Sequence, residues 1–389
     1  MWETISASDD PSKRALETAL FGRFHRQPGI CVASSRWYGQ ALIKLSDDLR
    51  TPQALWSTAV LRSAILLTMY ELIAATSSSG WIHHAGAIGR LLEARGPYRH
   101  QQFEERSLLE IARPLVIAKA AVDAKRSFLE KPDWLQIPWA LIPDQKSLRD
   151  KLVDLSCVIP GIMENRRELA RTRKGLARLL ANTPERKNHS QQIERYHWAA
   201  AALVVRCGHL LDDVRIWKQA WDGQSNPITM FHFPVGTAAY PDYPEDLFGP
   251  PLSFYNLYEA NNFSMYYQVL TSLLRLTYEC HFEASLAASE TADQAIDTHL
   301  FLKPGIDLPA TDHDELLVER RKCAIEVCRS VPYHLSTELH GCGGAYVIML
   351  PLLMARPIFR PQSEEAKYID RVLAHLAGTW GNQTPQWFG

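Results

Sequence analysis

The sequence predicts an all-α fold, a large multi-helix bundle, and three observations lead to this prediction. Apolar residues recur at intervals of three and four positions over most of the 389 residues. No stretch alternates apolar and polar residues for more than a few positions, as a half-buried strand would. A hydrophobic content of 46% also allows a chain of this length to bury a large core.

Start and stop signals place the individual helices. In the first half the predicted helices are 15–24, 35–49 with Ser35 as N-cap, 51–75 with Thr51 and Pro52 as its start, 81–95, and 103–130 with a kink at Pro114. In the second half they are 146–178 around Pro160, 191–221, 252–288, 311–335, 341–356 and 364–376.

We expect one helical domain between two short end segments. An internal loop is expected where the helical period fails and where proline, glycine and aromatic residues gather. The expected parts are a flexible N-terminus at 1–12, a helical domain at 13–378 with closely packed halves 13–222 and 252–378 joined by the loop 222–251, and a tail at 379–389.

The stretch from Trp81 to Pro97 is predicted to be a short helix with a well-marked end. Gly96 can adopt a left-handed conformation, and Pro97 cannot continue a helix. Gly86 and Gly89 lie inside the stretch, where glycine costs about 1 kcal/mol relative to alanine unless close contacts compensate. We therefore expect this helix to be pressed against another helix.

Charge and cysteine content argue against several classes of protein. The 42 basic and 43 acidic residues nearly cancel, so no global field attracts the chain to nucleic acid or to a membrane. Seven scattered cysteines and the lack of an apolar signal at the start indicate a reducing intracellular compartment. The longest apolar stretch, 341–355, contains Pro351 and is shorter than the roughly 20 residues of a membrane helix.

Motifs spread over nearly the whole chain point to one family. Each motif is loose alone, but their order and spacing together are fairly specific. They are Tyr38-Gly39-Gln40-Ala41-Leu42 with Leu45 and Leu49, Leu66 to Glu71, Trp81 to Pro97, Phe128-Leu129 before Pro132-Asp133-Trp134, Ile137-Pro138-Trp139, Ile159-Pro160, Cys328 to Leu335, and Pro351-Leu352. The chain resembles the regulatory domain found downstream of the zinc binuclear cluster in fungus-specific transcription factors.

The resemblance implies a transcriptional regulator, or a regulator-like protein, of a secondary-metabolite pathway, located in the nucleus or alternatively in the cytoplasm. The sequence departs from the family in one respect, because the six closely spaced cysteines that hold two zinc ions are missing. We therefore expect no sequence-specific DNA binding by this chain. The expected partners are another transcription factor or co-regulator and a small-molecule effector, with no membrane partner and no cofactor.

The alternative is a helical scaffold of the regulator type recruited as a biosynthetic enzyme, a cyclase or an isomerase. Such chemistry needs a shaped pocket and one acid or base, and it leaves little signature in a sequence. A structural interaction module without a ligand is a third class. No catalytic residue is assigned, and the sequence leans away from an enzyme.

Eight residues are candidates for effector contact or for helix packing. His83 and His84 titrate near neutral pH, but adjacent helical residues point about 100° apart and cannot easily face one ion. Three arginines are candidates for orienting neighbouring helices or a ligand. The candidates are Trp81, His83, His84, Arg90, Arg95, Arg329, Tyr333 and His334.

No metal site is predicted. Asp212 and Asp213 resemble the aspartate pair of helical terpene cyclases, but Ile216 stands where a further carboxylate is needed, so we interpret the pair as a solvated helix face. The richest cluster of potential ligands lacks the His-Glu-x-x-His spacing of a zinc site. That cluster consists of His334, Glu338, His340 and Cys342.

A basic run within the predicted helix 146–178 is a candidate for phosphate contact, because clustered basic residues supply the salt-dependent part of DNA affinity. No aromatic residues interleave with the run, and we therefore interpret it as a solvated face. Its members are Arg166, Arg167, Arg171, Arg173, Lys174 and Arg178.

Overall fold

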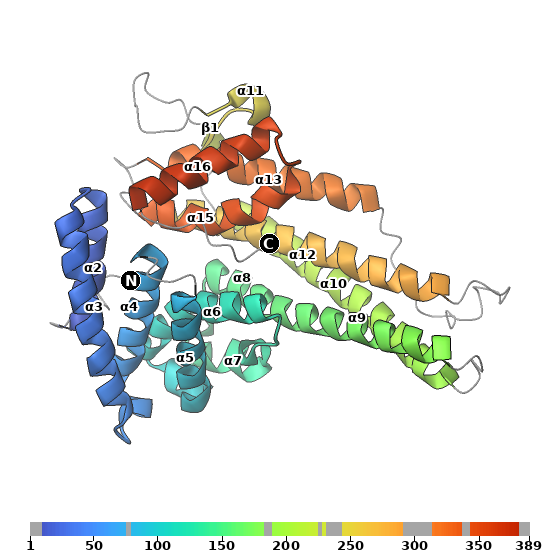
Figure 1. Ribbon diagram of the computed structural model, residues 1–389, viewed down its shortest axis with the longest axis horizontal. Coiled ribbons are helices and arrows are strands. Elements are labelled where there is room, and N and C mark those ends of the chain that lie inside the picture. The colour runs from blue at the N-terminus through green and yellow to red at the C-terminus, as the bar shows by residue number, and fades with distance from the viewer. Residues whose placement is uncertain are drawn as a thin grey trace.

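The computed structural model describes residues 10–74, 79–182, 189–224, 228–230, 243–290, 313–336 and 343–380, and it confirms the all-α fold. Among these residues the strands are limited to one antiparallel pair, β1 (Thr229–Met230) and β2 (Leu252–Ser253). Figure 1 shows the N-terminal helices at the left, the C-terminal helices above, and long helices that extend to the right.

The N-terminal part begins with a helical hairpin that packs across the next helix. The elements are α2 (Pro11–Phe24), α3 (Pro28–Leu49), α4 (Thr58–Ala74), α5 (Gly80–Arg95) and α6 (Phe103–Asp123). Helix α4 contacts α2, α3, α5 and α6. Its residues Leu61, Ile65 and Leu67 are almost completely buried, because α4 is apolar on nearly every side and lies between these neighbours.

A connector of short helices follows. It contains the 3₁₀ helix Phe128–Glu130, α7 (Pro132–Gln136), the 3₁₀ helices Ile137–Trp139 and Pro143–Gln145, and α8 (Leu148–Cys157). Trp134 and Trp139 are buried against α6 and α8. The guanidinium of the buried Arg113 lies 5.0 Å from the centre of the Trp139 ring and pairs with Asp154 of α8. The aromatic connector is therefore part of the core.

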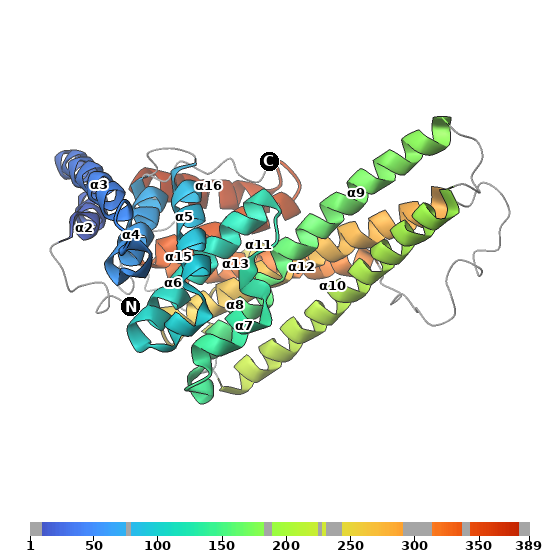
Figure 2. The same cartoon turned by 90° about the horizontal axis from the view of Figure 1, so that it is seen from below.

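Three long helices form an arm that projects from the rest of the protein in both Figure 1 and Figure 2. They are α9 (Ile159–Asn182), α10 (Ser190–Gln224) and α12 (Leu257–Glu290). The inner side of α10 packs on α12, where the Trp217 ring is stacked 5.7 Å from that of Tyr266. Helix α9 contacts both α10 and α12.

The C-terminal helices form a separate apolar cluster above the arm. The elements are α11 (Glu245–Phe248), α13 (His313–His334), α15 (Gly343–Ala355), the 3₁₀ helix Arg356–Ile358 and α16 (Glu364–Trp380). Their shared core includes Ile348, Leu352 and Ile369, all completely buried. Helix α16 also touches α2, so the two ends of the described chain meet.

Several predicted boundaries are wrong. Helix α3 starts at Pro28, so Ser35 lies inside it and donates to the Val32 carbonyl instead of capping. Thr51 and Pro52 start no long helix, because a turn and the 3₁₀ helix Ala54–Trp56 precede α4. Helix α6 does not reach residue 130, because Ala124 adopts a left-handed conformation that ends it.

The predicted 146–178 helix is two helices, α8 and α9, with Pro160 in the first turn of the second, where its missing N–H costs nothing. Helix α2 begins at Pro11, within the predicted flexible segment 1–12. Asp10 caps α2 through its carboxylate, and Ser12 is completely buried. Residues 1–9 and two parts of the predicted loop 222–251, namely 225–227 and 231–242, lie outside the described residues, and the division into two halves stays a prediction.

Candidate functional sites

The predicted site residues lie in two separate places. Trp81, His83, His84, Arg90 and Arg95 are on α5, which packs between α4 and α6. The close contact expected for α5 is confirmed, because a Cβ on the buried Gly89 would lie 3.5 Å from the Val116 side chain of α6. The remaining candidates are Arg329, Tyr333 and His334, on α13.

The paired histidines have different surroundings. His83 is exposed, as is Arg90, whereas His84 is partly buried and its Nε2 lies 3.1 Å from the Tyr38 hydroxyl. Trp81 is buried in the core between α4, α5 and α6. The two imidazoles therefore do not face a common site, as their positions on the helix predicted.

His84 belongs to a polar cluster that the sequence did not predict. The buried carboxylate of Glu71 on α4 lies close to Tyr38 of α3, and the Tyr38 hydroxyl in turn contacts His84 of α5. Burial raises the pKa of Tyr38, and the Glu71 charge raises it further. Burial lowers the pKa of His84, although the Glu71 charge opposes this shift. The cluster joins three helices and offers an acid, a base and a hydroxyl in one chain of contacts.

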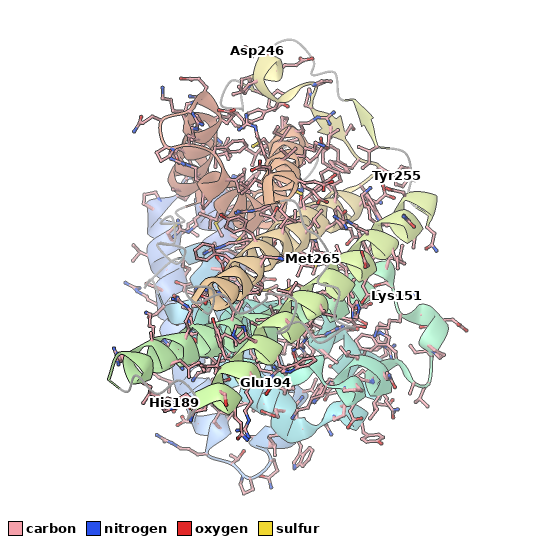
Figure 3. All side chains as sticks on the ribbon, turned by 90° about the vertical axis from the view of Figure 1, so that its right-hand side faces the viewer. Lys151, His189, Glu194, Asp246, Tyr255 and Met265 are labelled. Atoms are coloured by element: carbon pink, nitrogen blue, oxygen red, sulfur yellow. The ribbon has the colours of Figure 1, made fainter. Side chains whose placement is uncertain are left out.

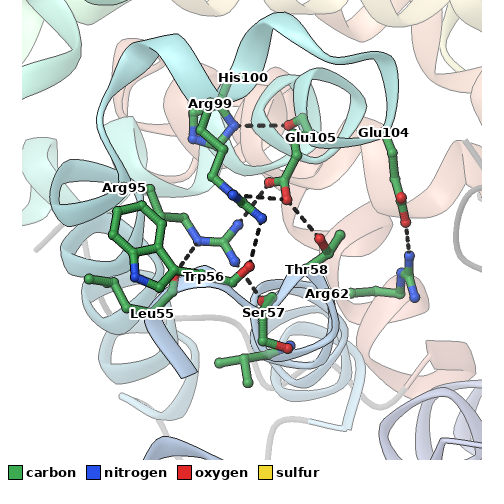
Figure 4. A network of polar contacts seen from close by, with 11 residues as sticks. Leu55, Trp56, Ser57, Thr58, Arg62, Arg95, Arg99, His100, Glu104 and Glu105 are labelled. Atoms are coloured by element: carbon green, nitrogen blue, oxygen red, sulfur yellow. Dashed lines mark hydrogen bonds and ion pairs between the residues drawn. The ribbon is translucent and has the colours of Figure 1, made fainter. Parts of the chain in front are cut away.

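Arg95 lies at the centre of a second polar network, shown in Figure 4. Its completely buried guanidinium donates to Glu105 Oε2 at 2.8 Å, to the Leu55 carbonyl at 2.7 Å and to the Ser57 carbonyl at 2.5 Å. Arg99 and Thr58 donate to the other oxygen of Glu105, at 3.2 and 2.7 Å. The network ties the end of α5 to the start of α6 and to the segment before α4.

The candidates on α13 pack against the base of α12 and the β2 strand. His334 is completely buried, with Nδ1 2.8 Å from the Ser330 carbonyl and Nε2 3.3 Å from the Ser264 hydroxyl. The ring of Tyr333 lies 5.2 Å from that of Phe254. Arg329 donates to the Pro250 carbonyl at 2.9 Å and pairs with Glu326. These contacts join α13 to its neighbours.

The described residues contain no group of three or more side chains arranged to hold a metal ion. Asp212 and Asp213 are exposed, and Asp212 pairs weakly with Arg215 on the same helix, at 3.9 Å. The other members of the predicted ligand cluster, Glu338, His340 and Cys342, lie outside the described residues. No described helix combines the length and the apolar character that crossing a membrane requires.

A groove of about 750 Å³ runs along the arm between α9 and α10. Figure 3 views the molecule from the tip of the arm, where His189 and Glu194 lie at the start of α10. Both helices contribute residues at the same spacing along the chain. The lining residues are Asn165, Glu168, Leu169, Thr172, Gly175, Leu176 and Leu179 of α9, and Gln192, Arg195, Tyr196, Ala199, Ala202, Leu203 and Arg206 of α10.

The floor of this groove is apolar, because Leu169, Leu176, Tyr196 and Leu203 are buried there. Its walls carry small side chains. Exposed Ala199 and Ala202 lie on one wall and exposed Thr172 and Gly175 on the other. A Cβ on Gly175 would meet no atom within 4 Å. The groove is open, and these four positions leave its walls low between the larger exposed side chains of Glu168, Leu179, Gln192 and Arg195.

The basic run predicted to be a solvated face divides between two roles. Arg166 and Arg173 pair with Glu279 and Glu283 of α12, each at 3.0 Å. Among the other members, Arg167 and Arg171 line a second, polar hollow that shares Glu168 and Thr172 with the groove, and Lys174 and Arg178 are exposed on α9 outside both linings. Arg171, Lys174, Arg178 and Arg195 are exposed and form no ion pair with any described residue.

Comparison with known proteins leaves the family of this chain unassigned. No protein family profile matches it, and no solved structure matches it. A relative, an uncharacterized protein of Emericella nidulans, is 31% identical over 175 residues. The match covers 43% of this chain and 38% of the relative's length.

Proposed function

We propose that the protein is a transcriptional regulator, or a regulator-like protein, of fungal type that acts by binding a protein partner in the nucleus. The regulated genes would be those of a secondary-metabolite pathway. The motif resemblance supports the family, and the all-α fold agrees with it. The observation that carries the proposal is the open groove on the projecting arm, where Leu179, Ala199 and Ala202 are exposed, because exposed apolar side chains gathered in a groove are typical of protein-binding sites.

The experiment is deletion of the gene, followed by measurement of transcripts and of metabolites in the same cultures. The proposal predicts that transcripts of a group of biosynthetic genes change together and that the intact gene restores them. Unchanged transcripts with an accumulated biosynthetic intermediate would contradict it.

That second outcome would favour a biosynthetic enzyme, the alternative function. One structural feature supports this alternative. Glu71, Tyr38 and His84 form a partly buried chain of acid, hydroxyl and base, which is the kind of equipment that a cyclase or an isomerase needs. Replacing His84 by Gln would then abolish product formation while leaving the protein folded.

A further inference from the structure

We propose that the groove between α9 and α10 binds one acidic amphipathic helix of the partner protein. The inference rests on the proposed function and names the chemistry of the partner. The first support is the spacing of the lining residues, because 165, 168, 169, 172, 175, 176 and 179 repeat on α9 the intervals of 192, 195, 196, 199, 202, 203 and 206 on α10. Two neighbouring helices with this matched spacing form a groove into which a third helix can pack.

The dimensions agree with a helical occupant. From Asn165 to Leu179 the groove follows α9 for about 21 Å, at the usual rise of about 1.5 Å per residue, which is roughly four helical turns. Gly175, Ala199 and Ala202 leave room for a helix backbone to approach closely, and the buried Leu176 and Leu203 provide an apolar floor. We expect the occupant to insert large apolar residues at intervals of three and four positions.

The charged side chains along the rim of the groove indicate the charge of the partner helix. This rim carries Arg195 and Arg206, which line the groove on α10, and Arg171 of α9, which lines the hollow that shares Glu168 and Thr172 with the groove. Arg171 and Arg195 form no ion pair with a described residue, Arg206 pairs with Glu130 at 3.5 Å, and Glu168 is the acidic residue that lines the groove. A helix with acidic residues along its exposed edge would pair with this rim and be guided toward it. Nucleic acid would match the charge, but it would not cover the exposed apolar side chains of Leu179, Ala199 and Ala202.

The test uses the full chain and a displayed library of randomised 18-residue helical peptides. Peptides are selected on the wild-type protein, and the enriched ones are labelled and titrated. The expected peptides are amphipathic and acidic, and their binding weakens as salt is raised, since the rim contacts are exposed to solvent. Enriched peptides that are basic or lack helical periodicity would overturn the proposal, and so would the absence of any enriched peptide.

Matched variants locate the site. Ala202→Glu places a charge in the groove, whereas Ala177→Glu makes the same change at an exposed position of α9 outside the lining. We expect Ala202→Glu to weaken peptide binding at least tenfold and Ala177→Glu to change it less than twofold, with the same helical content in both. Equal binding by the two variants would overturn the proposal.

Two further outcomes would also overturn it. One is a duplex DNA that binds through Arg171 and Lys174 and is insensitive to Ala202→Glu. The other is a dimer of this chain that Ala202→Glu dissociates. The readouts separate this inference from the proposed function: failed peptide binding with regulated transcripts would remove the inference alone, whereas unchanged transcripts after gene deletion would remove the proposed function even if the groove binds the selected peptides.

Discussion

Replacing Arg95 by Met tests whether the buried network of Figure 4 holds the N-terminal part together. The substitution keeps much of the side-chain volume but removes the charge and three donated hydrogen bonds. The carboxylate of Glu105, 8% exposed, would keep Arg99 as its cationic partner, and the Arg99 side chain is 34% exposed. The carbonyls of Leu55 and Ser57 would lose a donor.

The expected cost follows from these changes. Removing one partner of a buried ion pair typically costs about 3–5 kcal/mol, because the remaining charge is left without compensation. Because Arg99 and Thr58 still donate to Glu105, we expect a loss at the lower end of this range, about 3 kcal/mol in the free energy of unfolding. The measurement is urea unfolding followed by circular dichroism at 222 nm.

Arg62→Met is the matched control. Arg62 of α4 pairs with Glu104 at the start of α6, one residue before Glu105, but the Glu104 carboxylate is 54% exposed. Exposed ion pairs contribute about 0–1 kcal/mol. Adding Glu105→Gln to Arg95→Met should recover part of the loss, because it removes a buried charge that only the partly exposed Arg99 still balances. If Arg95→Met costs no more than Arg62→Met, the proposed role of this network is wrong.

Three other predictions concern pH, backbone contact and redox chemistry. Burial and the nearby Asp150 charge raise the pKa of Glu110 to about 7. Because the folded state then holds this proton more tightly than the unfolded state, the free energy of unfolding of wild type should fall relative to that of Glu110→Gln as pH rises from 4.5 to 7. Parallel pH profiles of the two proteins would refute this. A Cβ on Gly344 would lie 1.8 Å from the His334 carbonyl oxygen, so Gly344→Ala should cost about 1–3 kcal/mol in urea unfolding. By contrast, Gly208→Ala, in open space within α10, should stabilise by up to about 1 kcal/mol, and equal effects of the two substitutions would contradict the geometry. The sulfurs of Cys207 on α10 and Cys280 on α12 are 3.8 Å apart. Treatment with diamide should therefore link these two cysteines as a disulfide, which peptide mass spectrometry detects. A disulfide between other cysteines in place of this one would contradict the prediction.

Much of the fold could be predicted from the sequence because its helices are long and their apolar residues periodic. The helix at α5 was placed to within a residue, since Gly96 and Pro97 mark its end. Local start signals were less reliable. Ser35 and Thr51-Pro52 are good caps in isolation, but α3 had already begun at Pro28, and the segment before α4 is fixed by Arg95 and Arg99 from distant positions.

The candidate sites could be predicted only in part, because they depend on which helix faces are left open. The matched spacing on α9 and α10 is visible in the sequence, yet it indicates a groove only once α12 is known to cover the other side of both helices. The Glu71 cluster was missed for the same reason. Glu71 stands alone among apolar residues on α4, and its contact with Tyr38 comes from a helix that precedes it by more than thirty positions.

The most direct test of this account is complementation of the gene-deletion strain with wild type, Ala202→Glu and Ala177→Glu, each expressed at the same protein level. The quantity measured is the abundance of the transcripts that deletion alters. We predict that wild type and Ala177→Glu restore these transcripts and that Ala202→Glu does not. Equal restoration by all three proteins would contradict a function exerted through the groove between α9 and α10.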